Sequence, residues 1–453
     1  MKIIVIDDDP TGSQTVNNCL LLLKWDYLTL IKGFKSESNL FFILANTRSL
    51  SQYDTKLRLK EICSVLKNII SSESFKDEEI ILVSRGDSTL RGHNFLEPKI
   101  INDCLGPFDA TFHIPAFIEG KRLTINGNHF VDNIPANKTI FAKDIIFGYE
   151  TNNIKDLLFQ KSKLEINLND IQNLKLSELK ILEIEEKNIV FKKLKNLNKN
   201  THVIVDAENY SQLNKFSLAI KKLSKQKKFL FRTAASFITS ISDVKNNVQK
   251  PSFYSHMRRK NSQKNFLPGL LIIGSHMELT TIQLKKFLEI SDCEPIELDV
   301  FEFFRIITSK NNQDKLIWFK NKFLAEIRFL LNKGNTPVIY TSRKLISLED
   351  NTEQVNFYNY LANFIAELVA DLKNEIGYLI SKGGITSNVI LSNGLKADYV
   401  YLQGQIITGI SLVTFKLKNG EDLPIVTFPG NIGNQDSLVR VWSILENKNK
   451  YSN

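Results

Sequence analysis

The sequence predicts an α/β fold: two α/β domains with mostly parallel sheets that face each other across a cleft. Short β-rich apolar runs alternate with longer amphipathic helical patterns, which is the order expected when helices connect parallel strands. The length of 453 residues suits two or three domains of roughly 150 residues each. A polar, basic segment that carries Pro251 and Pro268 interrupts the alternation. We therefore expect an N-terminal domain over residues 1–241, a linker over 242–268 and a C-terminal domain over 269–453.

The individual elements follow from the periodicity of the apolar residues. The expected strands are Ile3–Ile6, Ile80–Val83, Thr111–Ile114, Val203–Val205 and Phe229–Phe231 in the first half, and Leu270–Ile273, Val338–Tyr340 and Tyr378–Ile380 in the second. Amphipathic helices are expected over Thr55–Ile70, Thr281–Glu289, Asn356–Lys373 and Asp436–Leu445. In open α/β sheets ligands bind beyond the carboxyl ends of the strands, so the residues that follow each strand are the candidates for function.

Composition excludes several classes of protein. The formal net charge is +10, but the lysines are spread among Asn, Asp and Glu, so a small anionic substrate is expected rather than a nucleic acid. No apolar run approaches the ~18 residues that cross a bilayer, and the first residues enter a strand rather than a signal peptide. The four cysteines lie far apart. We expect a cytoplasmic protein with no membrane partner, no disulfide framework and no protein metal site.

Three consecutive acids, Asp7, Asp8 and Asp9, follow the first expected strand. Their mutual repulsion destabilises the fold unless cations or a metal lie close by. A helix N-cap would account for one of them and not for all three. We therefore expect at least one of these carboxylates to be functional.

The run Ser84–His93 follows the second expected strand and combines arginines, an aspartate, hydroxyl residues and glycines. Arginine forks can hold a carboxylate bidentately, hydroxyls can hold polyol oxygens, and an aspartate can accept a proton from an alcohol. We expect Arg85 and Arg91 to hold a substrate carboxylate and Asp87 to orient or deprotonate a hydroxyl. A loop and hairpin after Thr111–Ile114 bring three further candidates for anion contact, Lys121, Arg122 and His129, with a plain surface role as the alternative for each.

Glycine-bearing loops mark the second half. Gly274–Met277 and Ser381–Ser387 each follow an expected strand and open a helix, and Pro429–Asn434 precedes the last helix. Backbone N–H groups at such turns bind phosphate, so the loops together indicate a nucleotide site. Neither the GxxxxGK[ST] motif nor the GxGxxG motif is present, which means that the nucleotide cradle is of another kind.

The order of these motifs resembles that of the four-carbon acid sugar kinases, over nearly the whole chain from Met1 to about Leu445. The matching motifs are Asp7–Gly12, Ser84–His93, Pro115–Arg122, Arg232–Ser236, Gly274–Ser275, Lys382–Thr386 and Pro429–Asn431. In that family an N-terminal domain binds the sugar acid and a C-terminal domain binds ATP. The resemblance implies a carbohydrate kinase that uses ATP and Mg²⁺ to phosphorylate the C4 hydroxyl of a tetronate or 3-oxo-tetronate.

The motifs and the resemblance together assign residues to two pockets. The sugar-acid pocket is expected to contain Asp8, Asp9, Arg85, Ser88, Thr89, Arg122 and His129, with Asp87 and Arg91 as the catalytic residues. The ATP pocket is expected to contain Ser275, Lys382, Gly383, Gly384, Ile385, Thr386, Gly430 and Asn431. Mg²⁺ is expected to bridge the ATP phosphates with few protein ligands.

The chain departs from the resembled family at Met277, where a small hydroxyl residue is common, at Ile385, where an acid is common, and at Phe428, where a lysine is frequent. These departures favour one alternative, a non-catalytic sensor of sugar acid or nucleotide. A second alternative is a phosphohydrolase, because Asp7–Gly12 also satisfies the DxDxTG pattern of haloacid-dehalogenase-like enzymes, with Asp7 as nucleophile and Asp9 as acid/base. The sequence leaves open the stereoisomer used and the oligomeric state, a homo-oligomer included.

Overall fold

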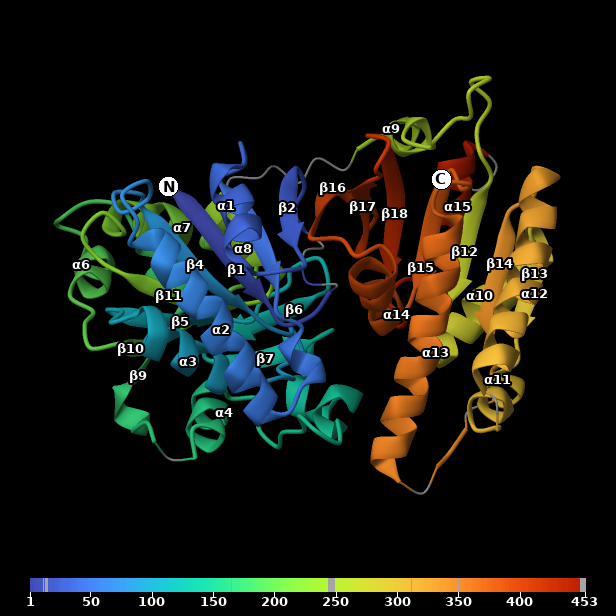
Figure 1. Ribbon diagram of the computed structural model, residues 1–453. Coiled ribbons are helices and arrows are strands. Elements are labelled where there is room, and N and C mark those ends of the chain that lie inside the picture. Colours follow the sequence, from blue (N-terminus) through green and yellow to red (C-terminus); the bar gives the residue numbers. More distant parts are fainter. Residues whose placement is uncertain are drawn as a thin grey trace. The chain divides into compact units, whose positions relative to one another are not determined.

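In the computed structural model the chain forms two compact units, Met1–Asn246 and Asn247–Asn453 (Figure 1). The structure describes residues 1–10, 12, 15–163, 165–242, 249–310, 312–344, 346–348 and 350–448, without the side chains of residues 351 and 352. The division falls inside the segment 242–268 that was predicted as a linker, of which residues 243–248 lie outside the described part. Residues 249–268 form part of the second unit, where Arg259 donates hydrogen bonds to the carbonyls of Lys373 (3.0 Å) and Ile376 (2.8 Å).

A parallel sheet forms the first unit. Its strand order is β2-β3-β1-β4-β11-β5-β10-β9, and its neighbouring strands are parallel, as predicted. The strands are β1 (Lys2–Asp7), β2 (Cys19–Leu22), β3 (Leu40–Leu44), β4 (Ile80–Arg85), β5 (Ala110–Ile114), β9 (Ile171–Leu174), β10 (Thr201–Val205) and β11 (Phe229–Thr233). A separate antiparallel sheet contains three strands, β6 (Arg122–Ile125), β7 (Asn128–Val131) and β8 (Ile134–Pro135). Its first two strands form the hairpin that was predicted after β5.

Successive side chains of a strand point to opposite faces of the sheet, and most of the strand residues here are buried. Helices therefore cover both faces. On one face Phe231 of β11 lies 5.0 Å, between ring centroids, from Phe237 of α8. The next residue, Arg232, reaches Glu97 of α3 on the other face, and Figure 1 shows α2 and α3 in front of the strands. The helices are α1 (Tyr27–Lys35), α2 (Gln52–Ile70), α3 (Leu96–Leu105), α4 (Ile154–Lys161), α5 (Leu176–Ile181), α6 (Ile189–Lys195), α7 (Tyr210–Leu223) and α8 (Ala235–Ser242).

The second unit has a mixed sheet with the strand order β13-β14-β12-β15-β18-β17-β16. The strands from β13 to β18 in this order are parallel, whereas β17 is antiparallel to both of its neighbours. The strands are β12 (Gly269–Ile273), β13 (Glu294–Leu298), β14 (Pro337–Thr341), β15 (Tyr378–Lys382), β16 (Tyr399–Ile407), β17 (Ile410–Lys416) and β18 (Asp422–Phe428). The mostly parallel sheet that was predicted for this half is confirmed.

Two aromatic clusters hold the helices of the second unit. Phe287 of α10 meets Trp442 of α15 edge-on at 5.5 Å between ring centroids. Phe303 of α11 packs against Phe364 of α13 at 5.1 Å, and Phe319 of α12 packs against Phe364 at 5.6 Å. The helices are α9 (Pro251–His256), α10 (Glu278–Ile290), α11 (Val300–Ile307), α12 (Asn312–Asn332), α13 (Asn351–Leu372), α14 (Gly384–Val389) and α15 (Ser437–Glu446), and the four helices predicted in the two halves are confirmed.

Candidate functional site

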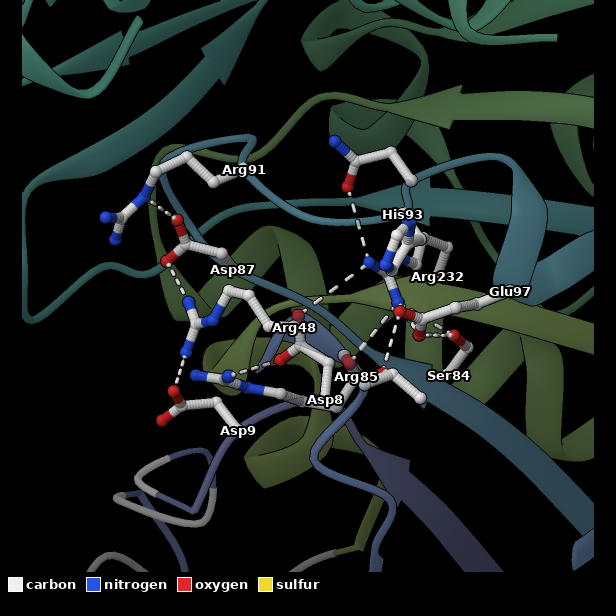
Figure 2. Close-up of polar contacts among 12 residues, drawn as sticks. Asp8, Asp9, Arg48, Ser84, Arg85, Asp87, Arg91, His93, Glu97 and Arg232 are labelled. Carbon is white, nitrogen blue, oxygen red and sulfur yellow. Dashed lines mark hydrogen bonds and ion pairs between the residues drawn. The ribbon is translucent and has the colours of Figure 1, made fainter. Parts of the chain in front are cut away.

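In the first unit, parallel pairing brings the predicted acidic and arginine-rich motifs together. Asp7 at the end of β1 is the register partner of Arg85 on β4, and Arg85 is the register partner of Thr233 on β11. The segments that follow these strands therefore begin at the same edge of the sheet. Figure 2 shows the resulting cluster of charged side chains. We call this cluster the charged edge, and its members are Asp7, Asp8, Asp9, Arg48, Arg85, Asp87, Arg91, Glu97 and Arg232.

Arg85 lies against the buried aspartates at this edge. Its Nη1 atom is 3.1 Å from Asp8 Oδ1 and 3.6 Å from Asp7 Oδ1. Burial raises the pKa of Asp7 to about 7, although the positive charge of Arg85 acts to lower it. Gly12 lies so close to Asp7 that a Cβ atom there would be 2.1 Å from the carboxylate oxygens, which explains the glycine at this position.

Asp9 and Asp87 are bridged by an arginine that the sequence analysis did not single out. Arg48, in the turn Thr47–Ser49 after β3, pairs with Asp9, and its Nη1 lies 3.2 Å from Asp87 Oδ1. On its other side Asp87 accepts a hydrogen bond from Arg91 Nε at 2.7 Å, and the hydroxyl of Thr89 also contacts it. Burial acts to raise the pKa of Asp87, but the positive charges of Arg48 and Arg91 hold it well below the usual range.

A second buried ion pair lies beneath this layer, between Arg232 and Glu97. Arg232 Nη1 is 2.7 Å from Glu97 Oε2 and donates to the Ser84 hydroxyl at 2.9 Å, while Nη2 lies 4.0 Å from Asp8 Oδ2. Burial raises the pKa of Glu97, and Arg232 acts to lower it. The role of Arg232 was open in the sequence analysis, and Glu97 was missed because it looks like an ordinary acid in the first turn of α3.

The hairpin supports the loop that carries Ser88 and Thr89. His129 is completely buried, its Nε2 lies 2.8 Å from the Ser88 carbonyl oxygen, and its Nδ1 lies 3.0 Å from the Thr124 hydroxyl. Burial lowers the pKa of His129 to about 4, so the imidazole is neutral near pH 7. The predicted substrate residue His129 therefore positions the loop in this structure rather than offering a cation. The Tyr149 hydroxyl donates to the Thr89 carbonyl oxygen at 2.7 Å.

In the second unit, three predicted glycine loops meet at the carboxyl ends of neighbouring strands. The amides of Gly274 and Ser275 each donate to the Lys382 carbonyl oxygen at 3.1 Å. The amide of Gly383 donates to the Phe428 carbonyl oxygen at 2.8 Å. The Thr280 hydroxyl donates to the carbonyl oxygen of Gly430 at 2.8 Å.

The absence of side chains permits this close approach. A Cβ atom at Gly274 would be 2.3 Å from Thr386 Oγ1, and one at Gly430 would be 2.4 Å from Ser275 Oγ. The structure thus brings together the predicted residues Ser275, Gly383, Gly384, Thr386 and Gly430. Ile385, with 69% of its surface exposed, and Asn431, also exposed, flank this cradle.

Lys382 lies at the centre of the three loops and is completely buried. Its Nζ donates to the Pro429 carbonyl oxygen at 3.0 Å and lies 3.7 Å from the centroid of the Phe428 ring. Burial lowers the pKa of Lys382 to about 7. Phe428 is its register partner on β18, so this chain places an amine beside the position at which the resembled family frequently has a lysine.

Arg343 is a further residue of this cradle that the sequence analysis missed. It follows β14, and its Nη1 donates to the Ser275 carbonyl oxygen at 2.7 Å while its Nη2 donates to the Thr341 carbonyl oxygen at 2.8 Å. The same rule that identified the other loops, a polar residue just beyond a predicted strand, applies to Arg343 after Val338–Tyr340.

Comparison with known proteins assigns both halves of the chain to described families of domains. One family model, described as a sugar-binding N-terminal domain, matches residues 3–241, and another, described as a nucleotide-binding C-terminal domain, matches residues 270–438. The fold and the two family models thus define a two-domain α/β protein with a sugar-binding first unit and a nucleotide-binding second unit. The chain belongs to the four-carbon acid sugar kinase family.

Solved structures share the fold at low sequence identity. A Haemophilus influenzae protein is 16% identical, with a TM-score of 0.65 over 98% of this chain and 100% of its own. A Salmonella typhimurium protein that is provisionally named a tRNA synthase is 14% identical, with a TM-score of 0.70 over 97% of this chain and 98% of its own. No protein of curated function matches the sequence. In the described part of the chain, no helix has the length and apolar character that a membrane crossing requires.

Proposed function

We propose that the chain is an ATP-dependent kinase that phosphorylates the C4 hydroxyl of a four-carbon acid sugar, a tetronate or 3-oxo-tetronate. One observation carries this proposal: a sugar-binding unit with an arginine-rich edge is joined in one chain to a nucleotide-binding unit with a backbone cradle. An ionised carboxylate such as that of Asp87 can orient a sugar hydroxyl, and glycine loops at the carboxyl ends of parallel strands suit phosphate groups. Family membership supports the same reaction.

In the proposed reaction the C4 hydroxyl oxygen forms a bond to the γ-phosphorus of ATP, and the bond from that phosphorus to the β–γ bridging oxygen breaks. The bridging oxygen leaves with ADP, and the hydroxyl proton passes to solvent water. Such a transfer depends on positioning and charge neutralisation more than on covalent chemistry. Asp87, an ionised carboxylate between Arg48 and Arg91, can accept the hydrogen bond of the hydroxyl and so orient its oxygen. The strong lowering of its pKa makes Asp87 a weak base, so orientation is the role that we assign to it.

ATP would be held by the loops of the second unit. The amide of Gly383 already donates to the Phe428 carbonyl oxygen. The donors for phosphate would therefore be the amide of Gly384, at the start of helix α14, and the hydroxyls of Ser275 and Thr386 in the same loops. Within the described ranges, no group of three or more His, Cys, Asp or Glu side chains is arranged to hold a metal ion. Mg²⁺, when bound, would be held chiefly by the ATP phosphates and would supply charge neutralisation there.

The experiment that tests this function is an ADP-release assay with ATP and Mg²⁺ over erythronate, threonate and their 3-oxo forms. Substrate-dependent ADP release, with a 4-phosphorylated product identified by mass spectrometry, is expected for at least one of these acids. ATP binding without turnover over the whole panel would replace the proposal with a sensor function. Release of inorganic phosphate from phosphorylated sugars without ATP would replace it with a phosphohydrolase.

We expect nucleotide affinity to fall by up to about tenfold per pH unit as the pH rises from about 7 to about 9. In the free protein the Lys382 pKa is about 7, and phosphates in the surrounding loops favour the ammonium form and raise that pKa. Binding in this window therefore takes up a proton, and affinity is lost as the pH rises. Isothermal titration calorimetry with ATP and Mg²⁺ in buffers of different ionisation enthalpy measures both quantities.

The control for this prediction is Lys382→Met, which should bind ATP more weakly and lose the proton uptake. The strands next to Lys382 and the short helix α14 carry no other charged side chain except Asp422, at the far end of β18. His276 and Arg343, on the loops after β12 and β14, remain in the variant, so any pH dependence that they cause persists in it. The same slope in both proteins would contradict the assignment to Lys382.

A further inference from the structure

We infer that Arg122 is the receptor for the substrate carboxylate, and that it makes the first unit select sugar acids over neutral polyols. This inference rests on the proposed function and names the group that recognises the acid. From the sequence, Arg85 and Arg91 were expected to hold the carboxylate. The structure supplies a reason to assign it elsewhere, because those arginines already have anionic partners.

The other arginines of the charged edge are neutralised by protein carboxylates. Arg85 pairs with Asp8, Arg48 bridges Asp9 and Asp87, and Arg91 pairs with Asp87. Arg232 pairs with Glu97. A substrate carboxylate that approached any of them would compete with a carboxylate already in place and would be repelled by it.

Arg122 has no such partner in the described part of the chain. Its Nε atom is buried without a hydrogen-bond partner, and no carboxylate lies within ion-pairing distance of it. Burial lowers the pKa of Arg122. The negative charges of Asp87 and Asp132 act to raise this pKa, whereas the positive charges of Arg91 and Arg85 act to lower it. The side chain of Arg122 leaves β6 on the same face as that of Thr124, whose hydroxyl contacts the His129 ring that reaches the Ser88 carbonyl oxygen. The guanidinium thus lies on the hairpin face that meets the charged edge, and its own charge is unpaired. A buried polar group without a partner is costly, and a ligand that completes it recovers that cost.

The local fold holds this guanidinium in place. Arg122 and Phe117 exchange two backbone hydrogen bonds of 2.9 Å, and the Arg122 guanidinium carbon lies 5.4 Å from the centroid of the Phe117 ring. Gly120 completes the turn, because a Cβ atom there would be 2.5 Å from both Arg122 Nη1 and the Phe117 ring. A side chain held in this way loses little entropy when it binds a ligand, and the planar fork matches the two oxygens of a carboxylate.

Steady-state kinetics with two pairs of substrates tests the inference: the acids erythronate and threonate, and the neutral polyols erythritol and threitol. In Arg122→Gln the KM for the acid substrate should rise about 10- to 100-fold with a much smaller change in kcat. The KM for the corresponding polyol should stay near the wild-type value. The adjacent exposed residue gives a matched control, since Lys121→Gln removes the same charge and should leave the KM for the acid unchanged.

Phenylglyoxal, a reagent specific for arginine, gives a second readout on the wild-type protein. We expect Arg122 to be modified before Arg85, and threonate to slow its modification where threitol does not, as followed by peptide mass spectrometry. This readout decides the question even if Arg122→Gln does not fold. An unchanged KM for the acid in a folded variant, or equal protection by threonate and threitol, would overturn the inference and leave the kinase proposal intact. If the wild-type protein neither binds nor phosphorylates any of the four compounds or the 3-oxo forms of the two acids, the proposed function itself fails, and the inference with it.

Discussion

Replacing Arg232 with methionine is expected to lower the free energy of unfolding of the first unit by about 3–5 kcal/mol, because it leaves a buried charge without its counter-ion. Arg232 is 5% exposed and Glu97 only 1%, so water cannot solvate the remaining carboxylate. The Ser84 hydroxyl would also lose the guanidinium that donates to it. Methionine keeps much of the length and volume of the arginine stem, so the effect reports the lost charge more than a cavity. Calorimetric melting of the full chain measures it.

The double variant Arg232→Met/Glu97→Gln is the control, because it removes both charges of the pair. We expect it to be more stable than Arg232→Met alone, since the neutral amide is less costly to bury than an unpaired carboxylate. The cost of Arg232→Met should also shrink in acid, because burial raises the pKa of Glu97 and protonation of its carboxyl removes the unpaired charge. Equal stabilities of the single and double variants would show that the unpaired Glu97 charge is not what destabilises Arg232→Met.

Much of the site was predictable because chemistry-bearing residues directly followed recognisable strands. Asp7–Asp9 after β1 and Ser84–Arg91 after β4 were found in this way, and parallel pairing brings them together. Arg48 escaped the same rule because β3 was not predicted. Its apolar run, Leu40–Leu44, is as fully buried as the run Ile3–Ile6 that was predicted as a strand, so the same interpretation would have identified it. A strand prediction there would have placed Arg48 just beyond a carboxyl end, next to Asp9.

Other parts of the site depend on contacts that sequence patterns do not report. Glu97 reaches Arg232 across 135 positions in the chain, and nothing in the first turn of α3 signals that partner. The chemical state of a predicted residue is equally hidden. Asp87 and His129 were both singled out from the sequence, but Arg48 and Arg91 determine the charge of the first, and burial determines that of the second. Residue types can thus be predicted from the sequence, whereas pairing and protonation follow only from the fold.

In Asp87→Asn we expect kcat to fall by on the order of 10²–10⁴ with the best four-carbon acid substrate. Asparagine preserves the shape of the side chain but removes the negative charge that Arg48 and Arg91 share. Both arginines would then be left without a counter-charge on that side, and the hydroxyl would lose the acceptor that orients it. The measurement is kcat by ADP release at saturating ATP and Mg²⁺, with melting temperature as the check on folding.

The pH dependence separates orientation from general-base catalysis. Because the pKa of Asp87 is held well below its usual range, the carboxylate stays ionised throughout the neutral region. The loss in Asp87→Asn should therefore be the same at about pH 6 and about pH 8.

Asp144→Asn is the matched control for this prediction. Asp144 Oδ2 lies 3.9 Å from Arg91 Nη1, while its Oδ1 accepts hydrogen bonds from the amides of Ile146 and Phe147, a role that asparagine can keep. This control should retain nearly the wild-type kcat. An unchanged kcat in Asp87→Asn would remove Asp87 from the reaction, whereas an equal loss in both variants would show that the charge around Arg91, and not the position of Asp87, is what the reaction requires.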